Sequence, residues 1–177
     1  MKLTGAAATN YFRKPDVTHT ALLIFGADAM RVADKRQTVI AALVGPQGEE
    51  EMRLTRINAS DLRKDPALLN DAMKAQGFFP GHRVAFVEDA TDGMSKVVDA
   101  ALKDWQPGDA QVVITAGQLT AKSALRKVVE GHRNAVAIGL YDDPMTVADV
   151  EHALSQAGIT QPDRDVMDAL MALAGML

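Results

Sequence analysis

Apolar residues recur along the chain in short runs that suit buried strands. Five runs predict strands, and the first is apolar at almost every position, which is typical of a strand buried on both faces of a parallel sheet. The second run alternates between apolar and polar residues, which favours a place near a sheet edge. The predicted strands cover residues 20–25, 52–57, 83–88, 111–115 and 135–140.

Between these runs, apolar residues repeat at the three- and four-residue spacing of amphipathic helices. Asp28 is a candidate N-cap for the second helix, which Gly45-Pro46-Gln47-Gly48 ends, and Ser60 or Asp61 is a candidate cap for the third helical region. Pro66 divides that region into two short helices. The other helices are predicted over residues 3–14, 29–44, 92–105 and 121–131.

The alternation of strands and helices indicates an α/β fold. Its parallel five-stranded sheet should carry helices on both faces and right-handed crossovers.

The pattern changes after Tyr141, where no further strand is indicated. Helices are predicted over 147–157 and from Pro162 onward. We therefore expect residues 1–141 to form the α/β domain and 142–177 to begin a helical, lid-type domain. The apolar pattern is interrupted at Leu177, which suggests a truncated chain.

Composition narrows the classes of function. The net charge of −4 provides no general basic field for nucleic acid, so any such contact requires a local patch or other subunits. The chain has no cysteine, which excludes thiolate catalysis and cysteine-based zinc sites. We find neither a membrane-spanning run nor a signal peptide, and expect a cytoplasmic protein.

The junction after the first strand, Phe25-Gly26-Ala27-Asp28-Ala29-Met30-Arg31, is where a doubly wound fold would bind a nucleotide. A phosphate-binding loop needs several glycines and a Lys-Ser/Thr pair. This junction has one glycine, and Asp28 places a negative charge where a phosphate would lie. We therefore expect a capped tight turn, no cofactor and no catalytic activity.

Other polar residues show no catalytic or metal-binding spacing. Glu88-Asp89 ends the third strand, where many P-loop ATPases hold magnesium, but without the phosphate loop we read it as a solvated strand end. The scattered histidines predict no metal site; they are His19, His82, His132 and His152.

Two segments are candidate interaction surfaces. Phe78 and Phe79 lie between Gly77 and Pro80-Gly81, so they either tuck under the sheet edge or form an apolar plug for a partner. The second segment, Ser123-Ala124-Leu125-Arg126-Lys127, is either a capped amphipathic helix or a contact surface for acidic partners or DNA phosphates.

Three segments resemble the N-terminal part of the delta subunit of the bacterial DNA polymerase III clamp loader, and their order covers essentially the whole chain. The first is Leu22-Leu23-Ile24-Phe25-Gly26-Ala27-Asp28. The second extends from Leu68 to Val87 and contains Phe78-Phe79-Pro80-Gly81-His82-Arg83-Val84. The third joins Ala116-Gly117-Gln118-Leu119 to Ser123-Ala124-Leu125-Arg126-Lys127 and Glu130.

This resemblance implies an AAA+-like domain without ATPase residues, followed by a helical domain. It implies that Phe78 and Phe79 bind the sliding clamp and that the preceding helix, with Met73 near its end, lies on the clamp surface. Arg126 and Lys127 are possible partner or DNA contacts. The implied partners are the clamp, the other clamp-loader subunits, and DNA indirectly or weakly.

The resemblance further implies a part in opening the clamp during DNA replication, with ATP hydrolysis left to partner subunits. Two alternatives stay open, a nucleotide-binding doubly wound enzyme or sensor and a purely structural scaffold. The family's third helical domain has no counterpart in these residues, which places assembly into a full loader in question.

Overall fold

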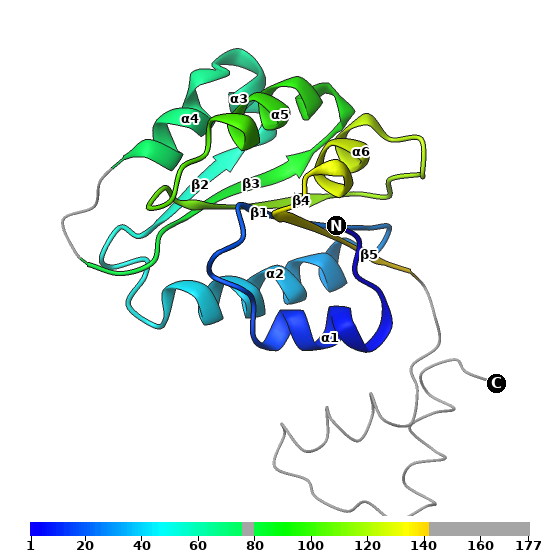
Figure 1. Cartoon of the computed structure of the whole chain (residues 1–177), viewed down its shortest axis with the longest axis horizontal. Helices are drawn as coiled ribbons and strands as arrows, with labels where there is room; N and C mark the ends of the chain where they lie inside the picture. Colours follow the sequence, from blue (N-terminus) through cyan, green and yellow to red (C-terminus); the bar gives the residue numbers. More distant parts are fainter. Residues whose placement is uncertain (76–79, 142–177) are drawn as a thin grey trace, which may run out of the picture. The chain divides into compact units, whose positions relative to one another are not determined.

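The computed structural model describes residues 1–75 and 80–141 (Figure 1). The chain divides into two units, Met1–Tyr141 and Asp142–Leu177, and the first contains every described residue. The helices predicted beyond Tyr141 lie outside the described residues.

A parallel five-stranded sheet forms the centre of the first unit (Figure 1). Its order is β2-β3-β4-β1-β5, so β1 is enclosed by strands that follow it much later in the chain. All five predicted strands are confirmed, with small shifts at their ends. They are β1 (Ala21–Gly26), β2 (Leu54–Asn58), β3 (Val84–Ala90), β4 (Gln111–Ala116) and β5 (Ala135–Leu140).

Helices cover both faces of the sheet, as predicted. Figure 1 shows α1 and α2 on one face and the remaining helices on the other. The helices are α1 (Gly5–Arg13), α2 (Ala29–Val44), α3 (Ala59–Lys64), α4 (Ala67–Lys74), α5 (Ser95–Asp104) and α6 (Ala124–Gly131), and a 3-10 turn η1 (Asp92–Met94) precedes α5.

The alternation of side chains along the strands builds two separate cores. In β1, Leu22 and Ile24 pack under α1 and α2, whereas Leu23 and Phe25 face the helices of the other side. Every residue of β1 is buried, which confirms the prediction for this strand. β2 is the edge strand that its alternating pattern predicted.

Local signals explain most helix boundaries, and one prediction among them is wrong. Gly45 ends α2 at φ 74°, a conformation that glycine adopts easily. The cap of α3 is Asn58, not Ser60 or Asp61, because the Asn58 side chain accepts the backbone N–H of Ser60 at 2.9 Å. All three residue types are favoured at a cap, so the end of β2 decides which one is used.

The chain also contains a sheet contact that the pattern does not indicate. Lys2 forms an isolated parallel bridge with Ala137, and Leu3 donates its N–H to the Ala137 carbonyl at 3.1 Å. These bonds fill the free side of β5. In the described part of the chain, no helix has both the length and the apolar character needed to cross a membrane.

Candidate functional site

The carboxyl end of β1 is where this fold would receive a nucleotide. Gly26 ends the strand, and a Cβ atom there would lie 2.6 Å from the Leu140 carbonyl oxygen. Close packing against the end of β5 therefore requires glycine at this position. The packing of β1 against β5 accounts for the single glycine of this junction, so Gly26 is not evidence for a phosphate-binding loop.

Asp28 closes the first turn of α2. Its carboxylate accepts the N–H groups of Met30 at 3.1 Å and Arg31 at 3.2 Å. Such N–H groups are the ones that a phosphate would use at a helix N-terminus. The Arg31 guanidinium donates to the Tyr141 carbonyl. The N-cap prediction is confirmed, and the junction presents a fixed negative charge.

The end of β3 holds the acidic pair predicted to be solvated. Glu88 is half-buried and Asp89 is exposed, and Asp89 adopts φ 59° where the β3–β4 register shifts. The pairing of β3 with β4 is therefore irregular at the two carboxylates. Within residues 1–75 and 80–141, no cluster of three or more potential metal ligands occurs.

Three of the histidines have structural hydrogen bonds. His19 bonds the Tyr11 hydroxyl at 2.8 Å, and His82 bonds the Gln111 side chain at 2.8 Å. His132 accepts the Asn134 N–H at 3.1 Å. His152 lies outside the described residues.

Arg126 lies inside the protein, although the sequence suggests it as a contact residue. Only 6% of it is exposed, and its guanidinium carbon lies 5.0 Å from the centroid of the Phe25 ring. Its Nε donates to Glu130 at 2.7 Å, and this hydrogen bond raises the pKa of Arg126. Lys127, the next residue, is exposed. Of the two, Lys127 alone offers surface to a partner, because Arg126 links α6 to the core.

The start of α6 is fixed by a hydrogen-bonded carboxylate. Ser123 caps the helix by accepting the Arg126 N–H at 3.2 Å, and its hydroxyl donates to Asp92. Asp92 also accepts the Leu125 N–H at 3.3 Å. The hydrogen bond from Ser123 holds the pKa of Asp92 below its usual value. The predicted capped amphipathic helix is therefore observed, but it begins at Ala124 and not at residue 121.

Met73 is also in the core. None of its surface is exposed, and it belongs to the same apolar cluster as Leu69 and Ala110. The Met73 carbonyl accepts the Ala110 N–H at 2.9 Å, which joins the end of α4 to the start of β4. The side chain that the resemblance places on the clamp surface is therefore buried within the domain. Phe78 and Phe79, a few residues further on, lie outside the described residues.

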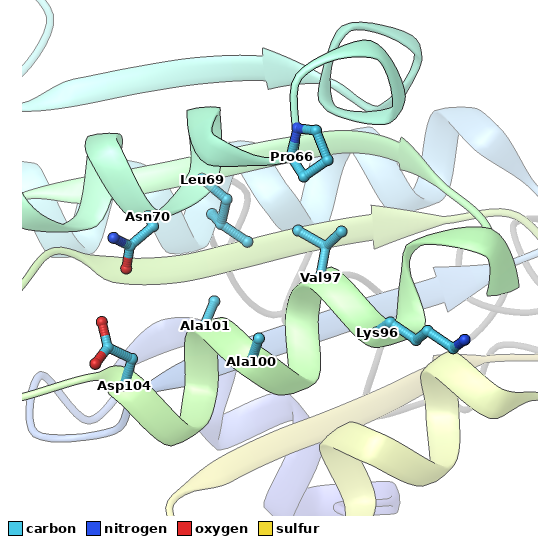
Figure 2. A pocket seen from close by; sticks show the side chains of 8 residues that line it. All are labelled: Pro66, Leu69, Asn70, Lys96, Val97, Ala100, Ala101 and Asp104. Carbon is cyan, nitrogen blue, oxygen red and sulfur yellow. The ribbon is translucent and has the colours of Figure 1, made fainter.

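A groove of about 440 Å³ runs between α4 and α5 (Figure 2). Leu69 of α4 faces Val97 and Ala101 of α5 across it, with Asn70 and Asp104 at one end. Its walls are mostly apolar and its ends are polar, which is the usual make-up of a binding groove. The remaining lining residues are Pro66, Lys96 and Ala100.

Little in the residue pattern marks this groove. Its width depends on the small side chains of Ala100 and Ala101, and Ala100 is exposed on a helix whose other face is buried. A small residue on an outer helix face is common, so periodicity alone does not indicate a groove.

Lys74 holds the end of α4 against the loop after α5. Its ammonium group donates to the Asp104 carbonyl at 2.8 Å and pairs with the Asp109 carboxylate. Burial is the largest single influence on Asp109 and raises its pKa, but the hydrogen bonds from Lys74 and the Gln106 N–H, together with the charges of Lys74 and Arg83, leave the pKa of Asp109 lowered. This contact orients the end of α4, from which residues 76–79 continue.

The candidate residues do not converge on one site. Met73 lies on α4, and Arg126 and Lys127 lie on α6, with α5 between the two helices (Figure 1). If α4 and α6 both contact partners, they provide separate surfaces.

The comparisons with known proteins show a fold and no family. Neither the models of known protein families nor the curated proteins match this chain. Among solved structures, the Bacillus subtilis DNA clamp loader delta protein is similar over 80% of this chain, with a TM-score of 0.55 and 13% identity. The chain spans 44% of the length of that protein.

Two further structures match with lower scores. A variant of Thermotoga maritima RuvB has a TM-score of 0.43 over 85% of this chain and 46% of its own. A chain of the Escherichia coli MS115-1 HORMA:CdnC:Trip13 complex has a TM-score of 0.46 over 95% of this chain and 63% of its own. Each is 13% identical to this chain. The α/β fold of this chain is AAA+-like, as predicted.

Proposed function

We propose that this chain is a non-catalytic clamp-loader subunit that binds a sliding clamp and helps to open it during bacterial DNA replication. The observation that carries the proposal is the closed N-terminus of α2, where Asp28 takes the N–H groups that a nucleotide phosphate would need. The likeness in fold to a clamp loader delta protein supports it. In this proposal the AAA+-like domain acts through protein contacts and not through a nucleotide.

The clamp contact in this proposal is formed by Phe78 and Phe79, which follow α4. The anchoring of α4 supports this assignment. Met73 is buried and Lys74 pairs with Asp109, so the helix that leads into the aromatic pair is held rigidly against the domain. A rigid base reduces the conformational entropy that the partner must overcome when it binds.

The proposed partners are the sliding clamp and the other loader subunits, which would supply ATP hydrolysis. Clamp opening requires that the subunit bind the open ring more tightly than the closed one. Such a protein would act in the cytoplasm.

The aromatic pair provides the test. Burying a phenylalanine side chain contributes about 1.5–3 kcal/mol. Phe78→Ala with Phe79→Ala should therefore weaken clamp binding by roughly two to four orders of magnitude, measured by surface plasmon resonance on the immobilised clamp. The melting temperature of the variant should stay close to that of the wild type.

A matched control removes apolar surface elsewhere. Met30 is 83% exposed at the start of α2, so Met30→Ala deletes an exposed apolar side chain on the side of the sheet opposite α4. This control should bind the clamp as the wild type does. Equal clamp affinity for the phenylalanine variant and the wild type would sink the proposal.

A further inference from the structure

Two arginines flank one buried aromatic ring on the α2 face of the sheet. Phe86 of β3 is 1% exposed, and the guanidinium carbon of Arg36 lies 5.0 Å from its ring centroid. The guanidinium carbon of Arg56 lies 5.5 Å from the same centroid. Arg56 stands opposite Phe86 in the β2–β3 register, while Arg36 comes from α2. The two positively charged guanidinium groups of Arg36 and Arg56 therefore lie close to the same Phe86 ring.

No carboxylate neutralises this pair in the described part of the chain. Neither arginine takes part in any of the ion pairs formed within residues 1–75 and 80–141. Glu88, two residues after Phe86 on the same side of β3, is not paired with either of them. Arg53, by contrast, has Glu51 at 3.0 Å. Two neighbouring guanidinium groups without a counter-charge favour an external anion, because it would relieve their repulsion.

The positive charge continues toward α1. Lys35, next to Arg36, places its ammonium group 5.8 Å from the Phe12 ring, and Phe12 is followed by the exposed Arg13 and Lys14. The two helices on this face contain a single acidic residue, Asp34, which is exposed and lies 4.0 Å from Lys35. This arginine-lysine strip is basic although the whole chain has a net charge of −4.

We propose that the strip of Arg13, Lys14, Lys35, Arg36 and Arg56 binds the phosphodiester backbone of nucleic acid, with Arg36 and Arg56 at its centre. The planar guanidinium group matches the paired oxygens of a phosphate, and stacking on Phe86 fixes its orientation. Several cations on one side of the sheet suit a polymer with repeated anions better than a single ion. The strip lies on the side of the sheet opposite α4, the helix that precedes the proposed clamp contact in sequence (Figure 1).

The test measures binding of the full chain to a labelled duplex and a labelled single strand by fluorescence anisotropy over a salt series. Each phosphate contact contributes about 0.9 to the slope of log K against log salt. Arg36→Gln with Arg56→Gln should therefore weaken binding at low salt at least about tenfold and reduce the slope by about 2. Clamp binding by this variant should not change.

A matched control removes two charges from the opposite face. Arg63 and Lys64 of α3 are both exposed, so Arg63→Gln with Lys64→Gln makes the same change in net charge. This control should retain the wild-type slope. Lys122→Gln with Lys127→Gln tests the surface of α6. If the salt dependence of binding decreases in that variant alone, nucleic acid binds at α6 and the proposal is overturned.

Other outcomes also decide the question. Absence of wild-type binding at low salt, or an unchanged slope in the double arginine variant, overturns the proposal. Displacement of the oligonucleotide by polyglutamate at equal charge concentration assigns the strip to acidic peptides instead. If the glutamine variant does not fold, Arg36→Lys with Arg56→Lys keeps the charge, and it should lose affinity while it retains the slope.

Discussion

Met73, near the end of α4, is a core residue and not a surface residue. The sequence resemblance places it on the clamp surface, but its side chain is fully buried beside Leu69. A helix with apolar residues on one face predicts burial of that face, and Met73 follows this rule. We therefore expect Met73 to contribute to folding, and to clamp binding only through the position of α4.

Truncation of Met73 tests this assignment. Met73→Ala should reduce the free energy of unfolding by about 2–5 kcal/mol, because it leaves a cavity in the core. Met73→Leu conserves volume and should cost less than about 1.5 kcal/mol while it leaves clamp affinity unchanged. Urea denaturation provides the first measurement and clamp binding the second. If Met73→Ala leaves stability unchanged and weakens clamp binding, Met73 contacts the clamp directly and the assignment to the core is wrong.

The lowered pKa of Asp92 predicts how the free energy of unfolding depends on pH in the acid range. Its pKa is lowered in the folded protein by the hydrogen bond from Ser123. An unfolded aspartate has a pKa of about 3.9, so below that pH the unfolded state binds more protons and stability falls. The contribution of Asp92 is therefore complete above about pH 3.9 and is lost as the pH drops through its folded pKa.

Asp92→Asn should flatten this acid limb in a series of urea denaturations. Asp71→Asn serves as the control, because Asp71 is exposed on α4. It should leave the acid limb as it is in the wild type. An acid limb that is equally steep in Asp92→Asn and the wild type would contradict the prediction. Asp109, whose pKa is also lowered, contributes to the same limb through Lys74.

At the scale of elements, α2 begins with the Asp28 cap, at the position where a nucleotide-binding chain of this fold would hold a phosphate. Asp28→Ala removes the N-cap and should cost about 0.5–2 kcal/mol in unfolding free energy. Asp34→Ala, an exposed site in the same helix, should change it by less than about 0.5 kcal/mol. Calorimetric titration with ATP and magnesium should give no binding heat for the wild type or for either variant. Clear saturable binding by the wild type would revive the nucleotide-binding alternative.

The sequence predicts the elements well because their signals are local. The apolar run at β1, the Asp28 cap and the break at Gly45 each depend on neighbouring residues. Ser60 and Asn58 show the limit, since both residue types suit a cap and the end of β2 decides between them. The sequence does not indicate the burial of Arg126 for a similar reason. Its place over Phe25 comes from packing between distant segments, and a basic residue in an amphipathic helix normally suggests solvent.

At the scale of the whole molecule, the α/β class follows from the alternation of elements, but the strand order does not. The sheet places β4 between β3 and β1 through hydrogen bonds that join residues far apart in sequence. The groove between α4 and α5 and the two arginines at Phe86 likewise arise only when separate elements pack together. Pattern reasoning finds single surfaces such as the aromatic pair, whereas sites assembled from several elements need the fold.

The central position of β1 has a consequence for synthesis on the ribosome. Ala21 pairs with Val112 on one side and with Ala135 on the other, so β1 has no sheet partner until β4 has been translated. At about 5–20 residues per second, the nascent chain carries this apolar strand unpaired for roughly five to twenty seconds. Unpaired apolar strands favour aggregation, so folding yield in the cell should depend on how fast translation reaches β4 and β5.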